Sequence, residues 1–148
     1  MTSHHYAGGC YCGNIALEVE LTEAAGAYRP RACDCDFCRR HGAAYLSDPR
    51  GRLAIRVERE SELGRYRQGD GLAEFLLCRT CGVLAAATWS DHGRLYGVVN
   101  SRAVADLAGL GPETPVSPRT LSAEAKTERW KRLWFSDVTL RVAYAPLA

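Results

Sequence analysis

The sequence has no long apolar run, and its N-terminus does not have the plan of a signal peptide. The longest apolar stretches, such as residues 82–88, are far shorter than the roughly 20 residues that a membrane-spanning helix needs. The chain opens with Met-Thr-Ser-His-His and shows no basic segment followed by an apolar one. These absences predict a soluble, cytoplasmic protein with no membrane partner.

Clustered positive charge is missing as well. The net charge is +2, from 19 Lys and Arg against 17 Asp and Glu, and the basic residues are scattered along the chain. Because phosphate binding normally requires a gathered basic face, no nucleic-acid partner is predicted. With 148 residues, 47% of them apolar and no internal repeat, the chain is predicted to be a single domain over 1–148. Composition gives no indication of the oligomeric state.

Cysteine, by contrast, is plentiful. Seven cysteines fall into three clusters, Cys10-Tyr-Cys12, Cys33-Asp-Cys35-Asp-Phe-Cys38 and Cys78-Arg-Thr-Cys81. An odd, tightly bunched set without a secretory signal disfavours a disulfide framework. A four-thiolate site would also suit iron, but the spacings match none of the ferredoxin runs, so zinc is favoured.

The clusters divide into four cysteines plus three. Both two-cysteine clusters are followed directly by a glycine, Gly13 and Gly82, as expected where a tight turn needs positive φ so that N–H groups can point at sulfur. The paired clusters are therefore predicted to form a tetrahedral structural zinc site that closes a long loop, with ligands Cys10, Cys12, Cys78 and Cys81.

The remaining triplet, Cys33, Cys35 and Cys38, is predicted to hold a second zinc from one side. Three protein ligands and a free position are typical of a catalytic zinc, where water or substrate takes the fourth place. The alternative is a second closed structural site, in which His41 or a carboxylate of Asp34 or Asp36 completes the ligand set.

Most of the remaining chain has the pattern of short strands. Apolar and polar residues alternate over 15–21 and 53–57, and further strands are expected over 73–77, 83–89 and 95–99. Turn signals at 69–71 and 91–93 separate them and place Cys78 and Cys81 in a knuckle between two strands. His92 is expected to be exposed in its turn, and His4 and His5 are expected in a frayed terminus.

Beyond residue 100 the pattern changes. We expect a short helix after Ser101 over 104–110, ended by Gly109 or Gly111, and a proline-rich loop over 112–118. An amphipathic helix over 122–134 with Trp130 and Trp134 on one side should follow, and then a strand over 138–144. The two tryptophans are expected in the core, or as the wall of a pocket.

Three segments together closely resemble the glutathione-dependent formaldehyde-activating enzyme family, which includes centromere protein V. They are Gly8-Gly-Cys-Tyr-Cys-Gly13, Cys33-Asp-Cys-Asp-Phe-Cys-Arg39 with Gly42-Ala43, and Leu77-Cys-Arg-Thr-Cys-Gly82. The resemblance covers 6–105 and leaves 106–148 as a C-terminal loop, helix and strand. It implies a mainly β fold, a β-tent of small antiparallel sheets stapled by the structural zinc, with one or two short C-terminal helices. It also implies the same division into four structural and three catalytic ligands.

The activity implied by the resemblance is the reversible joining of a small thiol, glutathione in the named members, to formaldehyde. The product is an S-hydroxymethyl adduct, and the enzyme is formally a carbon–sulfur lyase. Two zinc ions and a glutathione-like co-substrate are the implied cofactors, and a thiol and an aldehyde the implied partners. An open zinc suits this chemistry because it deprotonates a thiol near neutral pH. The alternatives are a non-enzymatic zinc-stapled binding module and a thiol carrier.

The three residues that directly follow the triplet are further candidates for binding the thiol or assisting the reaction. A zinc with three thiolates is already negative, so a fourth thiolate requires nearby positive charge, and Arg39 and Arg40 are positioned to supply it. Either arginine could instead bind a carboxylate of the ligand or lie on a solvated loop face. His41 could shuttle a proton, close the zinc site or simply pack.

Overall fold

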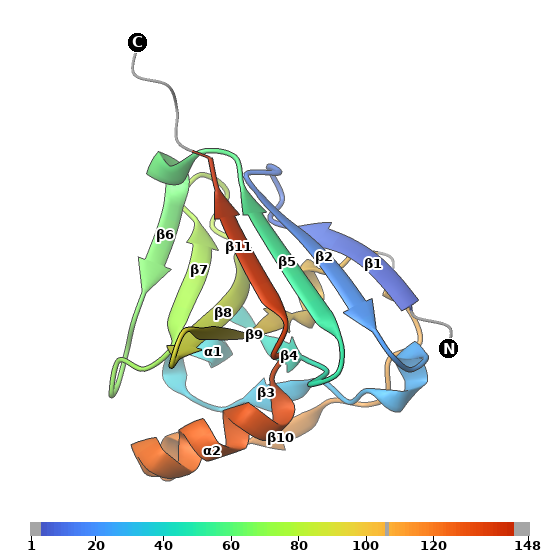
Figure 1. The fold of residues 1–148 in the computed structure, drawn as a ribbon, viewed down its shortest axis with the longest axis vertical. Coiled ribbons are helices and arrows are strands. Elements are labelled where there is room, and N and C mark those ends of the chain that lie inside the picture. The colour runs from blue at the N-terminus through green and yellow to red at the C-terminus, as the bar shows by residue number, and fades with distance from the viewer. Residues whose placement is uncertain (1–3, 106, 144–148) are drawn as a thin grey trace.

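Alternation of apolar and polar side chains builds a four-stranded sheet. Its central strands bury every second residue, so that one face of the sheet points into the core. The strand order is β1-β2-β5-β11, and β11 pairs with β5 in parallel while the other pairs are antiparallel (Figure 1). The strands are β1 (His4–Gly9), β2 (Ile15–Leu21), β5 (Arg52–Val57) and β11 (Val138–Val142).

A second sheet lies behind the first in the view of Figure 1. It has seven strands in the order β10-β3-β4-β9-β8-β7-β6. These are β3 (Arg31–Cys33), β4 (Ala44–Leu46), β6 (Leu63–Tyr66), β7 (Glu74–Cys78), β8 (Leu84–Asp91), β9 (Arg94–Asn100) and β10 (Thr114–Val116). This computed structural model describes residues 4–105 and 107–143.

Two α-helices are present in the described residues, α1 (Asp36–His41) and α2 (Ala123–Leu133). The side chain of Ser122 caps α2 by accepting a hydrogen bond from the N–H of Ala125 at 3.1 Å, which confirms the predicted amphipathic helix. α1 was not predicted. Short 3₁₀ helices occupy Ala25–Ala27, Glu60–Glu62, Ser101–Ala103 and Pro118–Thr120.

The helix predicted over 104–110 is wrong. Residues 104–105 and 107–110 form no α-helix. Val104 pairs with Gly8 in an antiparallel bridge, and the N–H of Ala105 donates to the carbonyl of Ala7. Residues 104–105 thus pair with the edge of β1, and Val104, Leu107 and Leu110 contact the core without forming a helix.

Two other expectations need correction. Residues 112–118 are not entirely a loop, because 114–116 form β10 at the edge of the seven-stranded sheet. An edge strand tolerates Pro115, whose backbone lacks an N–H group. His4 and His5 lie in β1 and not in a frayed terminus. His92 is 93% exposed in the β8–β9 turn, as predicted.

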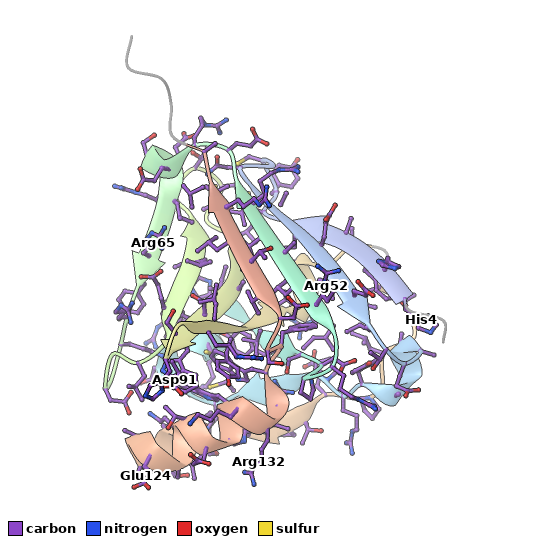
Figure 2. All side chains as sticks on the ribbon, viewed as in Figure 1. His4, Arg52, Arg65, Asp91, Glu124 and Arg132 are labelled. Atoms are coloured by element: carbon purple, nitrogen blue, oxygen red, sulfur yellow. The ribbon has the colours of Figure 1, made fainter. Side chains whose placement is uncertain are left out.

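The buried side chains form two clusters, and each contacts one group of cysteines. The first is built mainly from β2 and β5, with Phe135, and it includes Cys10 and Cys78. The second contains Cys38 together with the aromatic residues Tyr45, Trp89, Trp130 and Trp134. Figure 2 shows side chains filling the space between the ribbons, while Arg52 and Arg65 point outward.

The predicted fold class is confirmed as mainly β, and the strands expected over 15–21, 53–57, 73–77, 83–89 and 95–99 are all present. The sheets are nevertheless mixed, since β10 pairs with β3 and β11 with β5 in parallel. Tyr144, predicted in the last strand, lies outside the described residues. Among these residues, no helix has the length and apolar character needed to cross a membrane.

Candidate functional site

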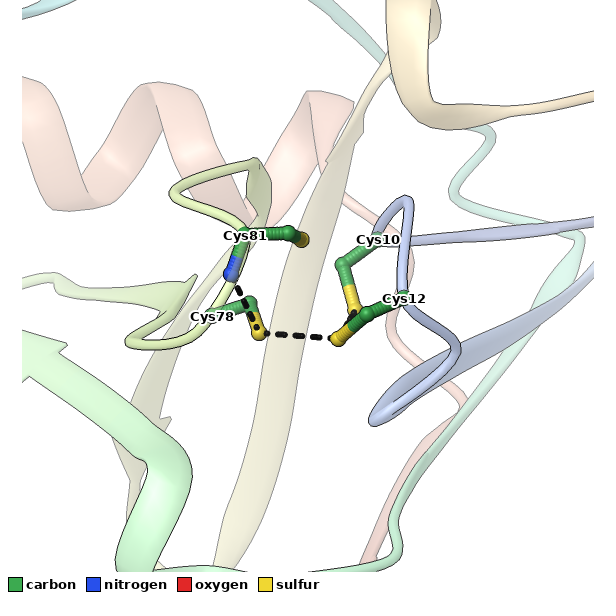
Figure 3. A group of neighbouring side chains, drawn as sticks. All are labelled: Cys10, Cys12, Cys78 and Cys81. Atoms are coloured by element: carbon green, nitrogen blue, oxygen red, sulfur yellow. Dashed lines mark hydrogen bonds between the residues drawn. The ribbon is translucent and has the colours of Figure 1, made fainter.

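Two turns far apart in the sequence bring the paired cysteines together. The β1–β2 connection carries Cys10 and Cys12, whereas Cys78 ends β7 and Cys81 lies in the β7–β8 connection (Figure 3). Their four Sγ atoms lie within 4.8 Å of one another. The Sγ atom of Cys12 is 3.4 Å from that of Cys78 and 3.8 Å from that of Cys10. The sulfurs therefore form a compact group that can hold a metal ion.

The backbone around this group has the predicted conformation. Gly13 and Gly82 adopt φ values of 88° and 79°, a region that side chains other than glycine rarely enter. The N–H of Ile15 donates to Cys10 Sγ at 3.2 Å, and the N–H of Cys81 donates to Cys78 Sγ at 3.4 Å. These donors favour thiolates. All seven cysteines are free, so the disfavoured disulfide framework is absent.

The cysteine triplet lies at the junction of a strand and a helix. Cys33 ends β3, Cys35 is the N-cap of α1, and Cys38 lies buried within α1. Their Sγ atoms also lie within 4.8 Å of one another, and no fourth His, Asp, Glu or Cys of the described residues joins them. The triplet therefore leaves room for one ligand that the described part of the chain does not supply.

The side chains considered as a fourth ligand have other partners. The Asp34 carboxylate accepts hydrogen bonds from Ser117 and Arg119. Asp36 lies 3.8 Å from the guanidinium of Arg39, and the ring of His41 packs against Phe37 at 4.8 Å between centroids.

Polar side chains contact two sulfurs of the triplet. The hydroxyl of Tyr45 lies 3.0 Å from Cys38 Sγ, and the amide nitrogen of Gln68 donates to Cys35 Sγ at 3.4 Å. The N–H of Cys38 also donates to Cys35 Sγ at 3.4 Å, as an N-cap requires. Two of the sulfurs are thus held in place by hydrogen bonds.

The thiols of the triplet differ in acidity because they share hydrogen bonds. The Cys38 thiol, together with the backbone and thiol of Cys35, lowers the pKa of Cys33 to about 6 against the opposing effect of burial. The hydrogen bond shared with Cys33, and then burial, raise the pKa of Cys38. Burial followed by the charge of Cys38 raises the pKa of Tyr45, so this hydroxyl stays protonated. Thiols packed this closely repel one another when ionised unless a cation joins them.

The triplet opens into a cavity of about 360 Å³. Trp130 and Trp134 of α2 line it, and their rings stack at 4.5 Å. The two tryptophans were expected either in the core or in the wall of a pocket. Both expectations are confirmed, because the side chains are buried and also line the cavity. The cavity also contains four basic side chains, Arg31, Arg119, Lys126 and Arg129.

Asp36 also lines this cavity, but Arg39, Arg40 and His41 do not. The Arg39 side chain is 69% exposed, and Arg40 is exposed and donates to the Asp36 carbonyl at 3.1 Å. Arg39 and Arg40 directly follow Cys38 in a helix, and neighbouring helical residues do not face the same side. His41 packs on the aromatic ring of Phe37.

Sequence reasoning missed most polar residues of the site, among them Arg31, Tyr45, Gln68 and Arg129. Arg31 precedes Cys33 by two positions in β3, so strand alternation could have placed both on one face. Tyr45, Gln68 and Arg129 carry no comparable signal, because tertiary packing alone brings them to the cavity.

The family model described as glutathione-dependent formaldehyde-activating enzyme matches residues 5–117. The chain belongs to this family. The matched residues include all seven cysteines, whereas α2 and β11 follow the matched segment.

A crystal structure of a Rhodobacter sphaeroides protein is also similar to this chain. The identity is 31% and the TM-score 0.52, and the similarity covers 73% of this chain and 99% of that one. No curated protein sequence matches the chain significantly. The family description names glutathione and formaldehyde, which are small molecules of a size suited to the cavity.

Proposed function

We propose that the chain is a zinc-dependent carbon–sulfur lyase that joins a glutathione-like thiol to formaldehyde and cleaves the adduct in reverse. The observation that carries the proposal is the cysteine triplet, which opens into a cavity of about 360 Å³ and leaves one ligand position free. Membership of the formaldehyde-activating family supports both substrates.

Two zinc ions fit the sulfur groups. Clustered thiolates are ligands that zinc prefers, and each group brings its Sγ atoms within 4.8 Å. Cys10, Cys12, Cys78 and Cys81 would hold the structural ion, and Cys33, Cys35 and Cys38 the catalytic one. When bound at the triplet, zinc would supply the Lewis acidity that favours the thiolate form of an incoming thiol at neutral pH.

The reaction itself balances without a further reagent. A sulfur–carbon bond forms, the carbonyl π bond of formaldehyde breaks, and the proton of the thiol ends on the former carbonyl oxygen. The reverse reaction cleaves the same sulfur–carbon bond.

The protein would contribute mainly by positioning. The Tyr45 hydroxyl and the Gln68 amide hold two of the sulfurs through hydrogen bonds of 3.0 and 3.4 Å. The stacked rings of Trp130 and Trp134 close one side of the cavity and exclude water there. Arg39, Arg40 and His41 lie on α1 outside the cavity, so we propose that the two arginines act only through long-range charge and that His41 packs.

Metal analysis with X-ray absorption tests this proposal. We expect two zinc ions per chain, and the triplet ion should gain one sulfur neighbour when glutathione is added. If two zinc ions are present and neither gains a sulfur neighbour with glutathione, or if only one ion is present, the chain would instead be a structural zinc-binding module.

Turnover separates an enzyme from a carrier. NMR with ¹³C-formaldehyde and glutathione should show exchange with the adduct faster than the uncatalysed reaction, and Cys38→Ser should remove the acceleration. A sulfur neighbour gained without acceleration would show a thiol carrier.

A further inference from the structure

We propose that the thiol co-substrate carries a carboxylate at the end remote from sulfur, and that Arg31 and Arg129 bind this carboxylate in the cavity. The inference rests on the proposed function, since it places the sulfur of the same molecule at the triplet. It goes further by naming the residues that bind the carboxylate of that thiol.

Arg31 reaches the cavity from the strand that carries the first cysteine of the triplet. Side chains two positions apart in a strand share a face, and Arg31 and Cys33 both line the cavity. One guanidinium nitrogen of Arg31 donates to Ser47 Oγ at 2.7 Å, and Ser47 in turn donates to the carbonyl of Leu133 at 2.6 Å. The guanidinium is therefore fixed in orientation and retains donors for a ligand.

Arg129 reaches the same cavity from α2. It follows Lys126 by one helical turn and precedes Trp130, and all three line the cavity. The cavity is therefore lined by the cysteine triplet and by two arginines from separate elements.

The ion pairs in the cavity are made by its other two basic side chains. Lys126 pairs with Asp70 at 3.2 Å, and Arg119 pairs with Asp34 at 3.2 Å. No carboxylate within residues 4–105 and 107–143 lies within 4.0 Å of a side-chain nitrogen of Arg31 or Arg129.

Electrostatics agrees with this geometry. Two cations that face one partly buried space stabilise an anion placed between them, and a carboxylate matches the planar fork of a guanidinium.

The remaining walls suit an aliphatic stem. The lining also includes the apolar residues Ala73, Phe75, Ala87 and Val98. A volume of about 360 Å³ suits a small mercaptocarboxylic acid or a short peptide thiol. Because Arg129 follows the family-matched residues 5–117, this selectivity comes partly from a helix outside that segment.

Equilibrium binding of three small thiols to the zinc-loaded protein tests the inference. The probes are 3-mercaptopropionate, neutral 2-mercaptoethanol and cationic cysteamine, measured by isothermal titration calorimetry. We expect 3-mercaptopropionate to bind most tightly. Arg129→Gln should weaken its binding by about tenfold, the loss expected for one charge-assisted hydrogen bond, and leave 2-mercaptoethanol unchanged.

Arg132→Gln is the matched control. It removes the same charge from the same helix, but Arg132 is exposed and projects away from the sheets in Figure 2. The control should keep the preference for the carboxylate, and Arg129→Lys should keep part of it. A fold defect would weaken all three thiols together, whereas loss of the carboxylate contact changes only their ratio.

Two results would overturn the inference in distinguishable ways. Equal affinity of the wild type for the three thiols would refute carboxylate binding by Arg31 and Arg129 and would leave the proposed function intact. Failure of every thiol to bind would refute both.

Discussion

The hydroxyl of Tyr45 lies 3.0 Å from the Sγ atom of Cys38, and both residues are buried. Tyr45 comes from β4 and Cys38 from α1, so this contact joins α1 to the seven-stranded sheet. The other two sulfurs of the triplet are partly accessible. Cys38 is therefore the rigid ligand of the group.

Replacing Tyr45 by phenylalanine should weaken metal binding at the triplet without unfolding the protein. The ring still fills the core, but Cys38 loses its hydroxyl partner, and loss of such a contact typically costs about 10–100-fold in metal affinity. Competition with a zinc chelator measures the change. Tyr96→Phe is the control, because that ring packs on Trp89 with a centroid distance of 5.2 Å and is not among the residues that line the cavity. Equal zinc affinity in the wild type and Tyr45→Phe would contradict the assigned role.

The four-cysteine group should be required for folding, whereas the cysteine triplet should be required only for binding its own zinc ion. We expect Cys38→Ser to keep the fold and lose one zinc ion, whereas Cys81→Ser should unfold the domain. The four-cysteine group, which contains Cys81, joins the β1–β2 turn to the β7–β8 turn. Structural zinc typically contributes on the order of 10 kcal/mol to folding. Circular dichroism and metal content measured on both variants test this. Equal loss of folding would show that the triplet is structural too.

Asp48 should make folding sensitive to acid. Burial opposes its ionisation, but hydrogen bonds from the Thr22 and Tyr28 hydroxyls and from two backbone N–H groups lower its pKa below the usual value. The stabilisation is therefore full above the unfolded pKa of about 3.9 and is lost as pH falls through the folded pKa. Asp48→Asn should lower the free energy of unfolding by about 1–3 kcal/mol at pH 7.

Urea unfolding between pH 7 and pH 3 measures the difference in the free energy of unfolding between the wild type and Asp48→Asn. This difference should become smaller as the pH falls. Asp137→Asn is the control, because its pair with Arg52 is exposed on both sides and should contribute less than about 1 kcal/mol. A difference that stays constant down to pH 3 would show that Asp48 does not act through its charge.

Gly8 is required by close packing of two backbones. A Cβ atom there would clash with the Ala103 carbonyl and lie 2.7 Å from Val104 Cα. Gly8→Ala should therefore destabilise the fold by about 1–3 kcal/mol in urea unfolding. Gly26→Ala serves as a comparison, since its Cβ would meet only the Gly109 carbonyl at 3.6 Å. Similar stability of the two variants would argue against tight packing at this bridge.

The central strands and the four-cysteine group were predictable because local rules govern them. β2 and β5 alternate since one face is buried, and Gly13 and Gly82 mark turns that only positive φ allows. The triplet was found for a similar reason, because its cysteines are close in sequence. These features need no knowledge of tertiary contacts.

The cavity could not be predicted in the same way. Arg31 and Arg129 are far apart in the chain. They line one cavity only because α2 packs against the second cluster of buried side chains, which contains Cys38 and the tryptophans. Arg39 and Arg40 were favoured for their proximity to Cys38, but a helix turns successive side chains away from one another. The helix expected over 104–110 failed because pairing with β1 outweighed local periodicity.

The parallel pairing of β11 with β5 also bears on biosynthesis. β5 pairs with β2 on one side early in translation, but its other side stays open until residues 138–142 leave the ribosome. An unpaired strand edge is a template for aggregation. The nascent chain should therefore need protection by chaperones until its last strand arrives, and a chain truncated before Val138 should be prone to self-association.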